Sequence, residues 1–141
     1  MAILDHADYE ALIYSLAENY PEQIRRSTLR LYTTSALTAR VEGEVHFTNG
    51  LVLKIREFLD FRIRKIIDYS YTIFRGDEKI RWYDPQPHPQ NQDLAETFPH
   101  HYHEEPDTKH NRKPAPGIAF EAPNLPGLIA DCITLGEMLA Q

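Results

Sequence analysis

The fold is decided by the stretch Val41-Glu42-Gly43-Glu44-Val45-His46-Phe47-Thr48-Asn49-Gly50-Leu51-Val52-Leu53-Lys54-Ile55. Apolar and polar residues alternate on both sides of Asn49-Gly50, which predicts two antiparallel strands joined by a tight turn. A three-residue turn over residues 48–50 gathers the apolar residues of both strands on one face, whereas a two-residue turn mixes the faces. We therefore predict the three-residue turn, with Gly50 in the left-handed conformation.

The other face of this hairpin is charged. In the predicted register Glu42 lies opposite Arg56, and Glu44 lies opposite Lys54. These carboxylates invite an acid–base interpretation, but opposite charges on facing strands are more typical of a solvated ionic face. We favour the ionic face.

A second hairpin is predicted around Gly76-Asp77, since glycine at the first central position suits a tight turn. This turn places Arg75 opposite Glu78, Ile73 opposite Ile80 and Tyr71 opposite Trp82. One face of the hairpin then consists of Ile67, Tyr69, Tyr71, Ile73, Ile80 and Trp82. Together the hairpins predict an antiparallel meander of about four or five strands over residues 28–84.

A helix is predicted on each side of this sheet. Residues 1–20 carry an apolar stripe at helical spacing that should end before Pro21, and it consists of Tyr9, Leu12, Ile13, Leu16, Ala17 and Tyr20. Residues 124–140 carry a second stripe, with Asn124 as a cap and Pro126 in the first turn. Cys132 lies on that stripe and is interpreted as a small buried apolar residue. The fold class is therefore α+β, in a single domain.

Composition limits the function. The chain has 141 residues, 42% of them hydrophobic, and a net charge of −6. This charge argues against a broad basic surface for nucleic acid, although not against a local basic groove. One cysteine allows neither a disulfide within the chain nor a thiolate metal site. No apolar run has transmembrane or signal-peptide length, so we expect a cytoplasmic protein without a membrane partner.

Residues 85–123 differ from the rest, because they hold most of the prolines and histidines. Repeated proline argues against a continuous helix or a central strand. A long segment of this kind in a small domain is usually functional or disordered. Its apolar residues favour an ordered loop against the sheet.

This loop and its entry carry the candidate chemistry. Imidazole titrates near neutrality and can act as an acid or a base, while Arg and Lys bind phosphate. The candidate acid and base residues are His100, His101, His103 and His110. The candidate substrate-binding residues are Lys109, Arg112, Tyr83 and His88. Such a set suits a metal-independent ribonuclease, which needs no cofactor.

Three other interpretations stay open. The histidines, with Glu104, Glu105 and Asp107 nearby, suit a metal-dependent hydrolase or nuclease, but their spacing matches no sharp metal motif and we assign no metal ligand. They could instead hold the loop by donating to backbone carbonyls. The protein could also be a non-catalytic module that inhibits a partner protein, and a homodimer would cover an exposed sheet edge.

Several blocks of the sequence resemble the TumE family, toxins of bacterial toxin–antitoxin modules. In chain order these blocks are Val41-Glu42-Gly43-Glu44-Val45, Asn49-Gly50-Leu51, Asp68-Tyr69-Ser70-Tyr71, Trp82-Tyr83-Asp84, Phe98-Pro99-His100-His101 and His110-Asn111-Arg112. The resemblance spans about residues 29–128. It implies a growth-inhibiting protein with a cognate antitoxin as its partner, and it assigns no catalytic residue. Joined to the histidines, it gives the leading hypothesis of a toxin that acts on RNA.

Overall fold

The computed structural model describes residues 5–85, 101–104, 112–114 and 118–140. Within them one eight-stranded sheet runs in the order β1-β3-β4-β5-β6-β7-β8, and β2 also pairs with β3. Every pairing is antiparallel. The strands are β1 (Ile24–Ser27), β2 (Arg30–Ser35), β3 (Thr38–Phe47), β4 (Leu51–Asp60), β5 (Lys65–Arg75), β6 (Glu78–Asp84), β7 (His101–Glu104) and β8 (Arg112–Pro114).

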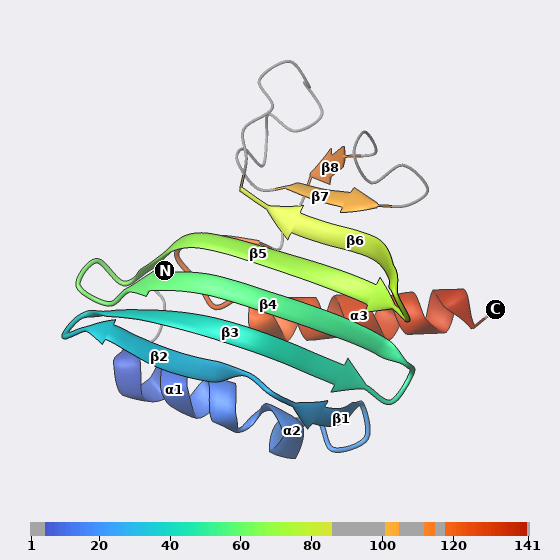
Figure 1. Cartoon of the computed structure of the whole chain (residues 1–141), viewed down its shortest axis with the longest axis horizontal. Coiled ribbons are helices and arrows are strands. Elements are labelled where there is room, and N and C mark those ends of the chain that lie inside the picture. Colours follow the sequence, from blue (N-terminus) through green and yellow to red (C-terminus); the bar gives the residue numbers. More distant parts are fainter. Residues whose placement is uncertain (1–4, 86–100, 105–111, 115–117, 141) are drawn as a thin grey trace.

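Helices α1 (His6–Tyr14), α2 (Leu16–Asn19) and α3 (Leu125–Leu139) cover one face of this sheet. Figure 1 shows α1 and α2 at the β1–β2 side and α3 behind the middle strands. The alternating apolar residues of β3, β4 and β5 point to these helices and form the core with them. We call this the covered face, and we call the other side, where the structure describes no helix, the open face. The predicted α+β class is confirmed, with more strands than the four or five expected.

The first hairpin follows the prediction. Glu42 pairs with Arg56, Glu44 with Lys54 and Val45 with Leu53, which is the register of a three-residue turn. Gly50 has φ +93° and its N–H donates to the Phe47 carbonyl. A side chain at this φ would be strained, so the glycine is required by the turn.

The second hairpin is only partly as predicted. Arg75 does pair with Glu78, but Ile73 pairs with Arg81 and Tyr71 pairs with Tyr83. The cause is a bulge at Ile80, which inserts one extra residue into β6 and exchanges the faces beyond it. The covered face therefore receives Tyr83 and not Trp82. A second irregularity, in β5, buries Ile66 and leaves Ile67 exposed.

The helices keep their predicted places with altered ends. The N-terminal helix is interrupted at Ser15, which separates α1 from α2. Helix α3 begins after Asn124 and has proline in its first turn, as predicted. The Asn124 side chain does not cap the helix. It is buried and bonds instead to Tyr71 and to the backbone of Ala119.

The histidine- and proline-rich segment contains two strands, which corrects the prediction that it forms only a loop. Strand β7 pairs with β6 on one side and with β8 on the other. Its four residues, His101–Glu104, fit between Pro99 and Pro106, so no proline interrupts the central strand. Pro114 lies in β8, the last strand of the described sheet, where a missing N–H is tolerated.

Candidate functional site

A single register row crosses the sheet from β3 to β8. Each residue of this row pairs with the next one, in the order Glu44, Lys54, Thr72, Trp82, His103 and Arg112. Adjacent strands are about 4.8 Å apart, so each residue lies beside its neighbour in the row. The row thus joins residues that lie far apart in the sequence, and two of them, His103 and Arg112, are candidate site residues.

The neighbouring positions on β7 bring the same blocks together. His101 pairs with Asp84 on β6 and with Pro114 on β8. Of the candidate acid and base residues, His101 and His103 therefore occupy the central strand of a three-stranded group. Arg112, a candidate binding residue, lies in the adjoining strand opposite His103.

Four candidate residues, namely His88, His100, Lys109 and His110, lie outside the described residues. Their roles stay predictions. The sheet nevertheless brings together His101, His103 and Arg112, which are parts of the same candidate set.

The Trp82 side chain lies on the open face in a polar setting. Its indole N–H donates to a carboxylate oxygen of Asp84 at 2.8 Å. The Lys79 ammonium lies 4.4 Å from the ring centroid, a cation–π distance. Trp82 is partly exposed, so this held ring presents an aromatic surface within the row.

Tyr83 lies on the covered face, with only 2% of its surface exposed. Its hydroxyl donates to Asp131 of α3 at 2.9 Å, and its ring meets Tyr71 edge-on at 6.4 Å. Burial raises the pKa of the Tyr83 hydroxyl, a hydrogen bond with Arg81 opposes part of the rise, and the nearby Asp131 charge adds to it. The side chain thus joins β6 to α3.

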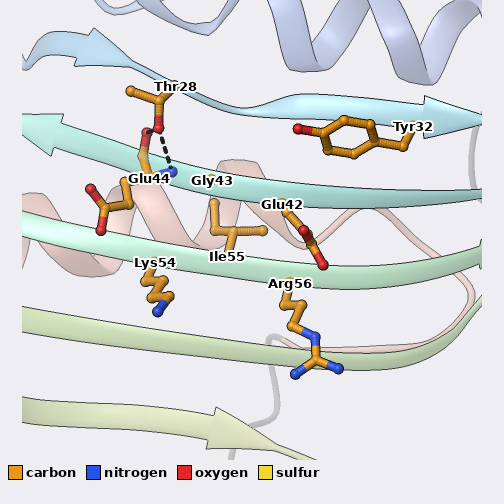
Figure 2. Close-up of a pocket in the computed structure, with 8 residues that line it drawn as sticks. All are labelled: Thr28, Tyr32, Glu42, Gly43, Glu44, Lys54, Ile55 and Arg56. Atoms are coloured by element: carbon orange, nitrogen blue, oxygen red, sulfur yellow. Dashed lines mark hydrogen bonds between the residues drawn. The ribbon is translucent and has the colours of Figure 1, made fainter.

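Two hollows lie next to one another on the open face. The larger has a volume of about 570 Å³, and its polar lining comes from Thr28, Tyr32, Glu42, Glu44, Lys54 and Arg56 (Figure 2). The smaller, about 290 Å³, is lined in part by His46, Val52 and Phe74. Glu44 and Lys54 belong to both hollows. The larger hollow extends the row toward β2, and the smaller one lies toward the β5–β6 turn.

The carboxylates of the larger hollow do not bind the cations opposite them. The Glu42 carboxylate forms an ion pair with the Arg40 guanidinium at 3.0 Å, and Glu44 contacts the His46 imidazole at 3.0 Å. Among the described residues Lys54 and Arg56 take part in no ion pair, although the Arg56 guanidinium lies 5.4 Å from the Phe58 ring. The predicted register is confirmed, but the ion pairs form along β3 and not between β3 and β4.

Positive charge exceeds negative charge on the described part of the open face. By register and exposure its cationic side chains are Arg26, Arg30, Arg40, Lys54, Arg56 and Lys79, while its acidic side chains are Glu42, Glu44, Asp68, Asp77 and Asp84. The whole chain carries −6. The acidic excess therefore lies elsewhere, and a local basic surface exists in spite of it.

The covered face holds a buried polar cluster that the sequence reasoning missed. Glu57 of β4 is fully buried, and its carboxyl oxygens accept from the Tyr9 hydroxyl at 2.7 Å and from the Tyr71 hydroxyl at 2.5 Å. Asn124 in turn donates to the Tyr71 hydroxyl at 3.0 Å. Burial raises the pKa of Glu57, and the two tyrosine hydrogen bonds oppose part of that rise. A signal was present, since Glu57 follows Leu51, Leu53 and Ile55 in the apolar alternation.

The remaining groups give no further site in the described residues. Cys132 is buried as predicted, and burial raises the pKa of its thiol. No group of three or more metal-ligating side chains occurs in the part of the chain that the structure describes. No helix among residues 5–85 and 118–140 is long and apolar enough to span a membrane.

Comparison with known proteins gives one match. The family model described as Toxin TumE matches residues 13–134, which is most of the chain. No curated protein and no solved structure matches significantly. The chain therefore belongs to the TumE toxin family, as the toxin of a toxin–antitoxin module whose partner is a cognate antitoxin.

Proposed function

We propose that this toxin acts on RNA as a metal-independent ribonuclease, with histidines of the segment 100–110 as acid and base. The observation that carries the proposal is the register row that joins Trp82, His103 and Arg112 on three adjacent strands. RNA cleavage needs three kinds of group. An aromatic ring stacks on a nucleobase, an imidazole transfers a proton, and a guanidinium binds the phosphate.

The reaction proceeds by attack of the ribose on its own phosphate. One imidazole takes the proton of the 2′-hydroxyl, and the 2′-oxygen forms a bond to phosphorus. The bond from phosphorus to the 5′-oxygen breaks, and an imidazolium donates its proton to that departing oxygen. The products are a 2′,3′-cyclic phosphate and a free 5′-hydroxyl, and no metal or cofactor is consumed or required.

The proposed roles follow the chemistry of each residue. His101 and His103, with His100 and His110, form the set from which the acid and the base come. Arg112 and Lys109 bind the phosphate and stabilise the negative charge that develops on it. Trp82 stacks on a base.

The two remaining candidates have separate roles. His88 lies close in sequence to the end of β6 and contributes to the same site. Tyr83 supports this site from the covered face, where its bond to Asp131 holds β6 against α3. The action is proposed to take place in the cytoplasm, where the antitoxin is also expected.

Induced expression in cells tests the proposal. We expect wild-type protein to arrest growth, and RNA from arrested cells to carry new ends with 2′,3′-cyclic phosphate. The double variant His101→Ala/His103→Ala should lose both effects while keeping its circular dichroism spectrum.

A histidine far from the row supplies the matched control. His6 lies on α1, where its ring stacks on Phe61 at 4.8 Å, and His6→Ala should arrest growth as wild type does. Full arrest by a folded His101→Ala/His103→Ala variant would overturn the catalytic role and favour inhibition by binding alone. RNA cleavage that stops when divalent metal is removed would favour the metal-dependent alternative.

A further inference from the structure

Lys54 and Arg56 stand on the open face beside a hollow, with no carboxylate bound to either within the described part of the chain. We propose that they form a phosphate-binding subsite, and that the substrate is single-stranded RNA lying along the row from this subsite to His103. This inference rests on the proposed function and adds to it the class of RNA and the path that it follows.

The charge arrangement supports an anionic ligand. A surface that only balanced its own charges would pair Glu42 with Arg56 and Glu44 with Lys54, because these residues face each other across β3 and β4. Instead both carboxylates bind groups on their own strand. In Figure 2 the head groups of Lys54 and Arg56 extend toward β5 and away from β3. Two adjacent cations thus remain available to a phosphate.

The position of the subsite gives the path. Lys54 and His103 belong to one register row and lie three strands apart, on β4 and β7. Three strand spacings correspond to about 14 Å. Thr72 and Trp82 occupy the positions between them. A ligand that reaches both ends is therefore a chain of more than one nucleotide.

Aromatic side chains along this path favour unpaired bases. Tyr32 borders the larger hollow and is 45% exposed, and Phe74 lines the smaller one. Together with Trp82, these residues place aromatic rings on both sides of Lys54 along the row. Bases stack on such rings only when they are not enclosed in a duplex, and stacking contributes about 1–3 kcal/mol per base in single-strand binding.

Fluorescence anisotropy with a short labelled RNA tests the subsite. The probe carries 2′-O-methyl riboses, so it lacks the hydroxyl nucleophile and binding is measured without cleavage. For Lys54→Ala/Arg56→Ala we expect Kd to rise at least tenfold at low salt. The slope of log Kd against log salt should fall by about 0.7, because the variant loses one phosphate contact and each contact on a single strand contributes about 0.7.

The matched control removes two cations elsewhere. Arg62 and Lys65 lie at the β4–β5 turn, where Arg62 forms an ion pair with the buried Asp60 and Lys65 forms one with the exposed Glu121. Arg62→Ala/Lys65→Ala changes the net charge equally and should keep the wild-type Kd and slope. A duplex of the same sequence should compete poorly with the probe.

The outcomes separate this inference from the proposed function. If the wild type cleaves RNA but Lys54→Ala/Arg56→Ala binds the probe as tightly as Arg62→Ala/Lys65→Ala does, the subsite is overturned and the proposed function stands. If the wild type neither binds nor cleaves RNA, both fail. If Lys54→Ala/Arg56→Ala loses antitoxin binding and keeps RNA binding, the two cations belong to a protein interface and the subsite is overturned.

Discussion

On the covered face of the sheet, the Glu57 carboxyl receives hydrogen bonds from Tyr9 and Tyr71, whereas on the open face Lys54 and Arg56 bind no described carboxylate. Both sets lie on or next to β4, and their residues alternate along it. The same strand therefore supplies a satisfied buried cluster to one side and unsatisfied charge to the other.

This difference separates stability from function. A buried polar group that loses its partners costs the free energy of its lost solvation, so the covered face must be self-sufficient. An exposed cation is solvated by water and costs little when it has no partner. Groups left available on the open face can bind a ligand, and changes there should affect activity without unfolding the protein.

The largest expected effect is the loss of the Glu57 carboxyl. Glu57→Ala removes two hydrogen bonds, leaves the Tyr9 and Tyr71 hydroxyls without their acceptor and opens a cavity in the core. We expect the free energy of unfolding to fall by about 3–5 kcal/mol. Glu44→Ala, the same change on the open face, should alter it by less than about 0.5 kcal/mol. Urea denaturation measures the free energy of unfolding of both variants. Equal losses in the two variants would contradict the difference between the covered and open faces.

A smaller loss is expected at Gly43, which lies against the backbone of the segment between β1 and β2. A Cβ at this position would lie 2.6 Å from the Thr28 carbonyl oxygen, and its φ is +143°. Gly43→Ala should therefore destabilise the protein by about 3 kcal/mol, from clash and backbone strain together. Gly50 has φ +93° but no atom within 4 Å of the added Cβ, so Gly50→Ala should cost only about 1 kcal/mol. Thermal unfolding measures the stability of both variants, and a larger loss for Gly50→Ala than for Gly43→Ala would contradict this prediction.

The pH dependence of stability sharpens the same comparison. Burial raises the pKa of Glu57 in the folded state, while the unfolded chain keeps the ordinary value of about 4.3. The stabilisation is therefore complete below that pH and declines as pH rises toward the folded pKa. Glu57→Gln cannot ionise, so wild type should lose stability relative to this variant as pH rises above the unfolded pKa of about 4.3. A difference in unfolding free energy between wild type and Glu57→Gln that does not change with pH would contradict the raised pKa of Glu57.

The smallest expected effect is at Tyr83. Tyr83→Phe removes the hydrogen bond to Asp131 and should cost about 1 kcal/mol. Growth arrest should be retained, because the hydroxyl lies on the covered face and does not contact RNA. A folded Tyr83→Phe variant that no longer arrests growth would give this residue a direct part in binding.

Local patterns were sufficient to predict the first hairpin. Alternation on both sides of Asn49-Gly50 set its register, and the structure agrees at Glu42–Arg56 and Glu44–Lys54. The predicted register of the second hairpin is wrong beyond Ile80, because a bulge exchanges the faces of β6. No residue type in this stretch indicates a bulge. Trp82 therefore lies on the open face and not, as predicted, on the apolar face, and Tyr83 occupies the buried position opposite Tyr71.

The candidate site could be predicted only as a set of residues. The sequence indicated His101, His103 and Arg112, but pairing among β6, β7 and β8 depends on contacts between distant segments. The subsite at Lys54 could not be predicted from local sequence patterns either, because it depends on which cation each carboxylate contacts. Glu44 contacts His46 because of side-chain geometry, which the strand register does not determine.

The measurement that tests the central claim most directly is cleavage of a labelled single-stranded RNA by the purified toxin, with EDTA present throughout. The account predicts that wild type cleaves it and leaves 2′,3′-cyclic phosphate ends, and that Lys54→Ala/Arg56→Ala cleaves it with a raised KM. His101→Ala/His103→Ala should leave it intact. Absence of cleavage by wild type, or undiminished cleavage by His101→Ala/His103→Ala, would contradict the account.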